Sequence, residues 1–417
     1  MRLLSALVLS TALCAPAFAA TPDEVTRTYA DIALATYEDS LTTAVALQAA
    51  VAALIADPTE ASLQAARSAW LAARVPYQQS EAFRFGNPVV DDWEGRVNAW
   101  PLDEGLIDYT ASDYGQNEEN ALAALNVIAT PKFTLSGKEI DATVISPELI
   151  SGTLHEADGI EANVASGYHA IEFLLWGQDL NGTGPGAGTR PYTDFLQGEG
   201  CTGGNCDRRA AYLQAATDLL VADLKEMTTA WAEGGAGREA VTAEPATGLL
   251  AALTGMGSLS YGELAGERIK LGLMLNDPEE EHDCFSDNTH NSHYYDGLGI
   301  RNVYLGSYTR VDGSVVAGPS LSDLVAAADP AVDSQLKAEL EASVAALGAI
   351  KAAGDAGRTF DQLIAPGNAE GEKLIMDAVT ALVTQTASID RAVTALGLSK
   401  VSFEGSDSLD DPNAVFQ

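Results

Sequence analysis

His169 and Glu172 stand three residues apart inside the apolar run GYHAIEFLLWG, which spans residues 167–177. On an α-helix, side chains with this spacing lie on one face, with Cβ atoms about 5–6 Å apart. The imidazole and the carboxylate can therefore bind one metal ion or hydrogen-bond each other. Burying either group without a partner is costly. The spacing thus predicts either half of a metal site or a satisfied polar pair in a helical core.

The standard metalloprotease motifs are incomplete around this pair. His155 and Glu156 begin an H-E-x-x-H pattern, but residue 159 is glycine. The inverted H-x-x-E-H pattern fails because Phe173 stands where its last histidine belongs. A catalytic zinc ion usually has three protein ligands. His169 and Glu172 supply two at most, so any further ligands must come from elsewhere in the fold.

Two glutamates are candidates to complete such a site. Glu81 lies in the block RVPYQQSEAFRF, which begins at Arg74, and Glu267 lies four residues after Glu263. One imidazole combined with several carboxylates suits iron, manganese or zinc. The alternative for each glutamate is a side chain that is solvated or paired with an arginine.

A second group of histidines lies within residues 279–296. His282, His290 and His293 are three of the five histidines in the chain, and Cys284 and Asp287 accompany them. Imidazole, thiolate and carboxylate groups can all bind a transition metal. The segment therefore predicts either a second metal or ligand site, or a polar loop packed at a domain junction.

The elements that must position these residues are helices. Alanine and leucine recur at helical spacing through most of the chain, and no convincing series of alternating strands appears. We expect irregular structure over residues 86–113 and a polar connection with modest strand character over residues 129–155. The expected class is all-α. The expected helices span residues 22–56, 59–85 with a kink at Pro76, 114–128, 157–177, 207–231, 243–275, 319–352 and 369–397.

Length and charge restrict the organisation of the chain further. The 417 residues exceed the usual size of one hydrophobic core, so we expect helical domains over residues 22–200 and 207–400, followed by a polar tail over 401–417. The formal net charge is −36, from 23 basic and 59 acidic residues. This balance argues against nucleic acid or an anionic membrane as a partner. It suits a soluble protein, including one that meets cations.

Residues 1–19 have the features of a secretory signal peptide. Arg2 is followed by an apolar stretch and by the small-x-small cleavage site Ala17-Phe18-Ala19. The apolar stretch is too short to span a membrane, and we expect no transmembrane segment after it. The sequence therefore predicts an exported protein, in the periplasm, with attachment to the outer membrane or release outside the cell as alternatives.

Three cysteines remain after the predicted cleavage. Cys201 and Cys206 flank a flexible loop that can close as a disulfide in an oxidising compartment. Cys284 would then be a free thiol.

Several blocks of the sequence resemble the imelysin-like family. The run from Gly167 to Asp179 resembles its GxHxxE motif. Upstream blocks of the family are matched around Arg74 and Tyr77, around Glu81 and Arg84, and over residues 98–109. The segment DPEEEHDCFSDNTH, residues 277–290, is similar to the branch called iron-regulated protein A.

The resemblance implies a fold and a setting. Members of the family have two helical-bundle domains, which an ancient duplication would relate to each other, and the expected functional site lies between these domains. Its members are exported, periplasmic or attached to the outer membrane, and are often associated with iron limitation and uptake. Metal-binding relatives place a glutamate from an earlier helix beside the His-x-x-Glu pair, and Glu81 is the matching position here.

Three hypotheses for the function follow. In the leading one, an exported protein of iron acquisition binds a divalent metal such as iron or zinc, or an iron-containing ligand, haem among them. The alternatives are a metallopeptidase that uses His169 and Glu172, and a structural or partner-docking component of an outer-membrane uptake system. The metal-site candidates are His169, Glu172, Glu81 and Glu267.

Overall fold

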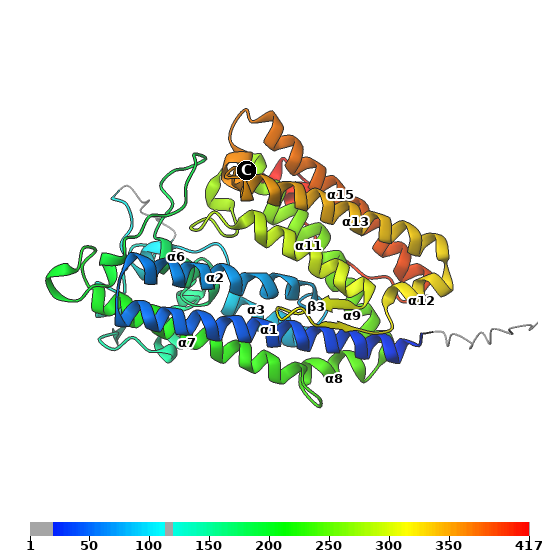
Figure 1. The fold of residues 1–417 in the computed structure, drawn as a ribbon, viewed down its shortest axis with the longest axis horizontal. Coiled ribbons are helices and arrows are strands. Elements are labelled where there is room, and N and C mark those ends of the chain that lie inside the picture. Colours follow the sequence, from blue (N-terminus) through cyan, green and yellow to red (C-terminus); the bar gives the residue numbers. More distant parts are fainter. Residues whose placement is uncertain (1–19, 113–119, 417) are drawn as a thin grey trace, which may run out of the picture.

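The computed structural model describes residues 20–112 and 120–416 (Figure 1). The predicted signal peptide lies outside the described residues, as do residues 114–119 of the helix expected over 114–128. Residues 120–128 form turns and no helix, so that expectation is wrong for the described part. The described chain is helical, with two short antiparallel hairpins: β1 (Lys132–Leu135) pairs with β2 (Lys138–Asp141), and β3 (Ser307–Thr309) pairs with β4 (Val315–Ala317). The predicted all-α class is confirmed.

A first group of helices is built around α1 (Pro22–Ala56), which packs along α2 (Glu60–Ser80) and α7 (Cys206–Trp231). Thr21 and Thr59 start α1 and α2 with capping boxes, which satisfy free backbone N–H groups of the first turn. The shorter helices α3 (Pro88–Asn98) and α6 (Gly167–Trp176) pack against each other and against α7.

Two expected boundaries in this region are wrong. Residues 86–113 are not irregular throughout, because Asn87 caps α3 and Pro88 occupies its first turn, where a missing N–H costs nothing. The helix expected from residue 157 begins only at Gly167. Glu156 and Asp158 adopt left-handed backbone angles, with φ of 52° and 60°, which a continuous helix cannot contain.

The second group of helices consists of one long run of consecutive helical segments and a layer of further helices packed on it. The run consists of α9 (Pro245–Ser258), the π-helical segment η6 (Leu259–Lys270) and α10 (Leu271–Leu275). The layer contains α11 (Thr289–Leu305), α12 (Leu321–Ala328), α13 (Pro330–Asp355) and α15 (Ala369–Ala395). The long helix α13 packs against both α11 and α15, and η6 packs against α15.

The two groups meet where α11 packs on α2 and α9 packs on α1 (Figure 1). A Cβ atom on Gly299 of α11 would lie 2.5 Å from the Gln79 carbonyl oxygen of α2, so glycine permits this close approach. Because α7 packs along α1, residues just after 206 belong spatially with the first group. The division at 200–207 stays a prediction.

The remaining short elements connect these helices, and α16 packs against η6 within the predicted polar tail. They are η1 (Glu81–Phe83), α4 (Glu104–Ile107), α5 (Pro147–Leu149), η2 (Ile150–Leu154), η3 (Ala157–Gly159), η4 (Tyr192–Phe195), η5 (Gly198–Gly200), α8 (Ala236–Thr242), η7 (Pro278–Glu280), α14 (Phe360–Ile364), α16 (Asp407–Asp410) and η8 (Ala414–Phe416).

Helix α1 is long and apolar enough to cross a membrane by length and composition, unlike what the sequence led us to expect. Three of its large apolar side chains, Leu47, Val51 and Leu54, are nevertheless fully buried in the core. Such a helix is also typical of the core of a folded domain. The composition of α1 is therefore weak evidence for a membrane span.

Candidate metal centre

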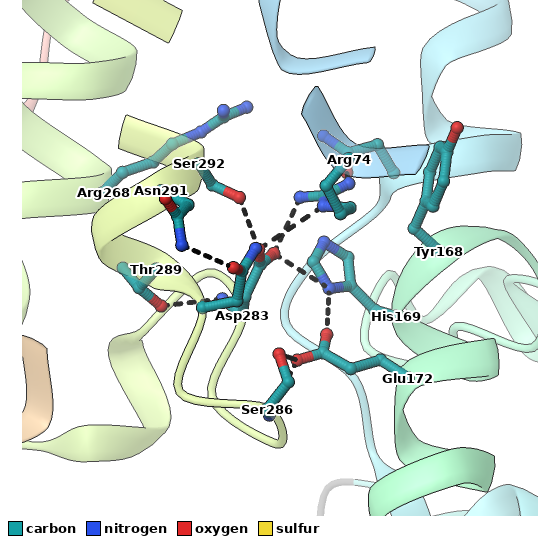
Figure 2. A network of polar contacts seen from close by, with 12 residues as sticks. Arg74, Tyr168, His169, Glu172, Arg268, Asp283, Ser286, Thr289, Asn291 and Ser292 are labelled. Atoms are coloured by element: carbon teal, nitrogen blue, oxygen red, sulfur yellow. Dashed lines mark hydrogen bonds and ion pairs between the residues drawn. The ribbon is translucent and has the colours of Figure 1, made fainter. Parts of the chain in front are cut away.

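The candidate site lies where α6 meets the loop between η7 and α11. His169 and Glu172 come from α6, whereas Asp283 comes from the loop (Figure 2), as does His282, the residue before it in sequence. One ligand atom from each of His169, His282 and Asp283 lies within 4.8 Å of the other two. We refer to these three residues as the donor group. Segments more than 100 residues apart in sequence thus converge on one point.

Gly167 fixes the start of α6 against α3. Its φ is +82°, and a Cβ atom there would lie 2.4 Å from the Val97 carbonyl oxygen. A side chain at this position would be strained and would push the two helices apart. All ten residues of α6 are buried, so His169 and Glu172 are fixed in a dry environment.

His169 is fully buried and has one ring nitrogen without a partner. Its Nδ1 lies 3.1 Å from Oε2 of Glu172, while Nε2 has no hydrogen-bond partner. Burial, and then the charge of Arg74, lower the pKa of His169 well below its ordinary value. The ring is therefore neutral, which is the form that binds metals. Nδ1 also lies 3.9 Å from Oδ1 of Asp283, so the same ring nitrogen faces both carboxyl groups.

Glu172 is placed to orient the His169 ring. Its Oε1 accepts hydrogen bonds from the backbone N–H of Ser286 at 3.0 Å and from the Ser286 hydroxyl at 2.6 Å. Burial, and then the nearby Asp283 carboxylate, raise the pKa of Glu172 well above its ordinary value. In metal sites, the ring N–H of a histidine that does not face the metal commonly donates a hydrogen bond to a carboxylate. The contacts of Glu172 match that orienting role.

Asp283 is an ionised carboxylate surrounded by donors. Its Oδ1 pairs with Nη2 of Arg74 at 2.7 Å, and both side chains are buried. Its Oδ2 accepts from Asn288 at 2.8 Å and from the hydroxyl of Ser292. Burial opposes ionisation, but Arg74 and these hydrogen bonds outweigh it and hold the pKa of Asp283 below its ordinary value. Figure 2 shows Arg74 and His169 on the same side of this carboxylate.

His282 completes the donor group. Its ring centroid lies 4.7 Å from that of His169, and its buried Nδ1 has no hydrogen-bond partner. Burial, followed by the charge of Arg268, lowers the pKa of His282 well below its ordinary value, so this ring is also neutral. Two neutral imidazoles and one ionised carboxylate form a ligand set suited to zinc or iron. The residues present therefore fit a divalent transition metal.

The other predicted metal ligands have different partners. Glu81 pairs with Arg268 at 2.7 Å, and this arginine also pairs with Glu263 at 2.7 Å and Asp296 at 3.2 Å. Glu267 is exposed. The structure thus brings neither Glu81 nor Glu267 into the donor group. The pairing of Glu81 with Arg268 joins residues 187 positions apart, which no local pattern indicates.

The residues matched by the upstream family blocks support the centre indirectly. Arg74 holds Asp283, and Tyr77 packs on Tyr168, with ring centroids 4.8 Å apart. Arg84 lies 3.5 Å from Glu94, away from the donor group.

The three histidines predicted as a second site diverge. His282 faces His169, whereas Nε2 of His290 lies 3.6 Å from Asp355 on α13. His293 packs edge-on against Phe360, and neither of its ring nitrogens has a hydrogen-bond partner.

Sequence reasoning missed Asp283 and Ser286. The available signal was that Asp283 directly follows His282 in an acidic loop, so both side chains can reach one site if the loop is ordered. Cys201 and Cys206 form a disulfide in the structure, and Cys284 is a buried free thiol.

Similar proteins place the chain in a family. A segment of 64 residues is 39% identical to iron-regulated protein A of Synechococcus elongatus, covering 15% of this chain and 18% of that relative. The chain therefore spans less than one fifth of that curated relative in the match.

Two solved structures share the fold. One is an iron-regulated protein A precursor from Parabacteroides distasonis, with 20% identity and a TM-score of 0.64 over 91% of this chain and 97% of the other. The second is an imelysin-like protein from Psychrobacter arcticum, with 15% identity and a TM-score of 0.59 over 92% and 99% of the two chains. The model of the imelysin family matches residues 33–389, and the protein therefore belongs to that family.

Proposed function

We propose that this protein is an exported, periplasmic component of iron acquisition that binds one divalent metal ion, iron or zinc, through His169, His282 and Asp283. The observation that carries the proposal is that one ligand atom from each of two buried imidazoles and one ionised carboxylate lies within 4.8 Å of the other two. The names of two relatives, which refer to iron regulation, support the connection with iron.

The energetics of burial favour this role over a purely structural one. A buried polar group without a hydrogen bond costs about 1–3 kcal/mol. His169 Nε2 and His282 Nδ1 both carry this cost. A metal ion held by the donor group would offset part of this cost, while Glu172 contacts the His169 ring and Arg74 fixes the carboxylate.

Calorimetric titration with Zn²⁺, and with Fe²⁺ under anaerobic conditions, tests the proposal. The wild-type protein should bind one ion per chain, and His169→Ala and His282→Ala should each abolish that binding. His290→Gln is the matched control, because His290 lies on the neighbouring helix outside the donor group and should leave stoichiometry unchanged. Equal binding by the wild type and all three variants would refute the assignment of the site.

The same preparations distinguish binding from hydrolysis. Glu172 contacts His169 through one oxygen and Ser286 through the other, and it lies outside the donor group that would hold the ion. We therefore expect no chelator-sensitive cleavage of an unstructured peptide. Cleavage that is lost in Glu172→Gln would replace the binding role by that of a metallopeptidase.

A further inference from the structure

A cavity of about 440 Å³ lies directly beside the donor group. His282 forms part of its wall, and Trp100 forms another part. The Trp100 ring centroid lies 5.1 Å from that of His169. Two residues that line the cavity thus contact the innermost histidine of the candidate centre.

Carboxylates dominate the charge of this cavity. Six glutamates line it, against the two guanidinium groups of Arg84 and Arg268. Both arginines are already engaged by Glu263, at 3.6 and 2.7 Å. Within the described chain, no lysine or arginine lies within ion-pair distance of four of the six glutamates, which are Glu156, Glu161, Glu267 and Glu280.

The cavity reaches the donor group at His282. His282 is only 3% exposed, lines the cavity, and has an Nδ1 atom without a hydrogen-bond partner. The acidic lining therefore ends at a neutral imidazole of the donor group. Acidic residues on an ordinary solvated surface would have no such buried nitrogen among them.

We infer that this cavity is the entrance of the metal centre and that it selects hydrated divalent cations over anionic iron complexes. The inference rests on the proposed function and adds the class of ligand. Clefts lined by charge of one sign concentrate the opposite sign and raise association rates about 10- to 1,000-fold. Six waters at about 30 Å³ each make a hydrated ion of about 180 Å³. The cavity is large enough for one such ion.

Stopped-flow measurement of Zn²⁺ association, followed by tryptophan fluorescence, tests the entrance. The variant combines Glu156→Gln, Glu161→Gln and Glu267→Gln, three exposed side chains whose neutralisation should not affect folding. We expect about a tenfold slower association at low ionic strength, a weaker dependence on salt, and unchanged stoichiometry.

The matched control neutralises Glu139, Glu199 and Glu372, which are equally exposed and do not line the cavity. It changes the net charge by the same amount and should leave the rate within about twofold of wild type. Equal slowing in both triple variants would overturn the inference, because net charge alone would then set the rate.

A second measurement addresses the class of ligand. The wild-type protein should take up Zn²⁺ or Fe²⁺ as free ions but should not bind ferric citrate or haemin as intact anions. Tight binding of either anion would overturn the inference. If Zn²⁺ binds to neither the wild type nor His169→Ala, the proposed function fails as well; if Zn²⁺ binds at a rate that is independent of the three glutamates, only the entrance fails.

Discussion

The ion pair between Arg74 and Asp283 should be among the strongest interactions that hold the candidate centre together. Both side chains are at most 1% exposed, and Nη2 and Oδ1 are 2.7 Å apart. Removing one partner of a buried pair leaves an uncompensated charge and costs about 3–5 kcal/mol. Arg74→Met and Asp283→Asn should each lower the free energy of unfolding by about that amount. The double variant should lose much less than the sum of the two.

The appropriate assay is urea unfolding of the wild type, the two single variants and the double variant in the presence of a chelator. Tryptophan fluorescence and far-ultraviolet circular dichroism should give coincident transitions, which justifies two-state analysis. We expect a coupling free energy of at least about 2 kcal/mol, within the range of about 1.5–7 kcal/mol measured elsewhere for close charge pairs.

A surface pair provides the matched control. Arg301 and Glu341 are 2.6 Å apart, but their side chains are 31% and 56% exposed. Exposed pairs contribute about 0.2–1 kcal/mol. The same cycle with Arg301→Met and Glu341→Gln should therefore give a coupling below about 1 kcal/mol. If the buried pair couples no more strongly than this surface pair, the reasoning from burial is refuted.

Three further predictions address pH, backbone geometry and ligation. Burial raises the pKa of Glu94 from 4.5 to about 7, so the folded state retains a proton that the unfolded state releases, and stability falls between these values. One pKa unit corresponds to about 1.4 kcal/mol. In urea unfolding, the free energy of unfolding of Glu94→Gln relative to wild type should therefore rise by about 3 kcal/mol between pH 4.5 and pH 8. A difference that stays constant with pH would contradict the shift. Gly167→Ala should cost at least about 2 kcal/mol in the same assay, because the added Cβ atom meets a carbonyl oxygen of α3 at 2.4 Å, whereas Gly152→Ala, with open space around its Cβ position, should cost little. Glu172→Gln should weaken Zn²⁺ binding about 10- to 100-fold in calorimetry while His169→Ala abolishes it, and equal loss in both would make Glu172 a direct ligand.

The corrected expectations share a local cause. Residues 86–113 were expected to be irregular, yet Asn87 and Pro88 within this range cap and begin α3. The expected helix over 157–177 proved to be α6 alone, because left-handed residues near 156–158 interrupt the chain before it. In both regions the local sequence is compatible with a helix and with irregular structure, and tertiary packing selects one of the two.

The sequence by itself determined the helical class and the placement of His169 and Glu172 on one helical face. Each of these depends on residues within one or two helical turns of each other, where 3.6-residue periodicity acts directly. For the same reason, the spacing of His169 and Glu172 correctly predicted contact between them, at 3.1 Å.

Only the tertiary structure decided which residues join that pair. Asp283 and His282 approach His169 from a loop more than 100 positions away, whereas Glu81, the residue matched by resemblance, pairs with Arg268. These contacts depend on how α6, α2, η6 and the loop before α11 pack, and on which arginine lies beside each buried carboxylate. Burial makes these ion pairs important for stability, because a buried carboxylate without a partner would cost several kcal/mol.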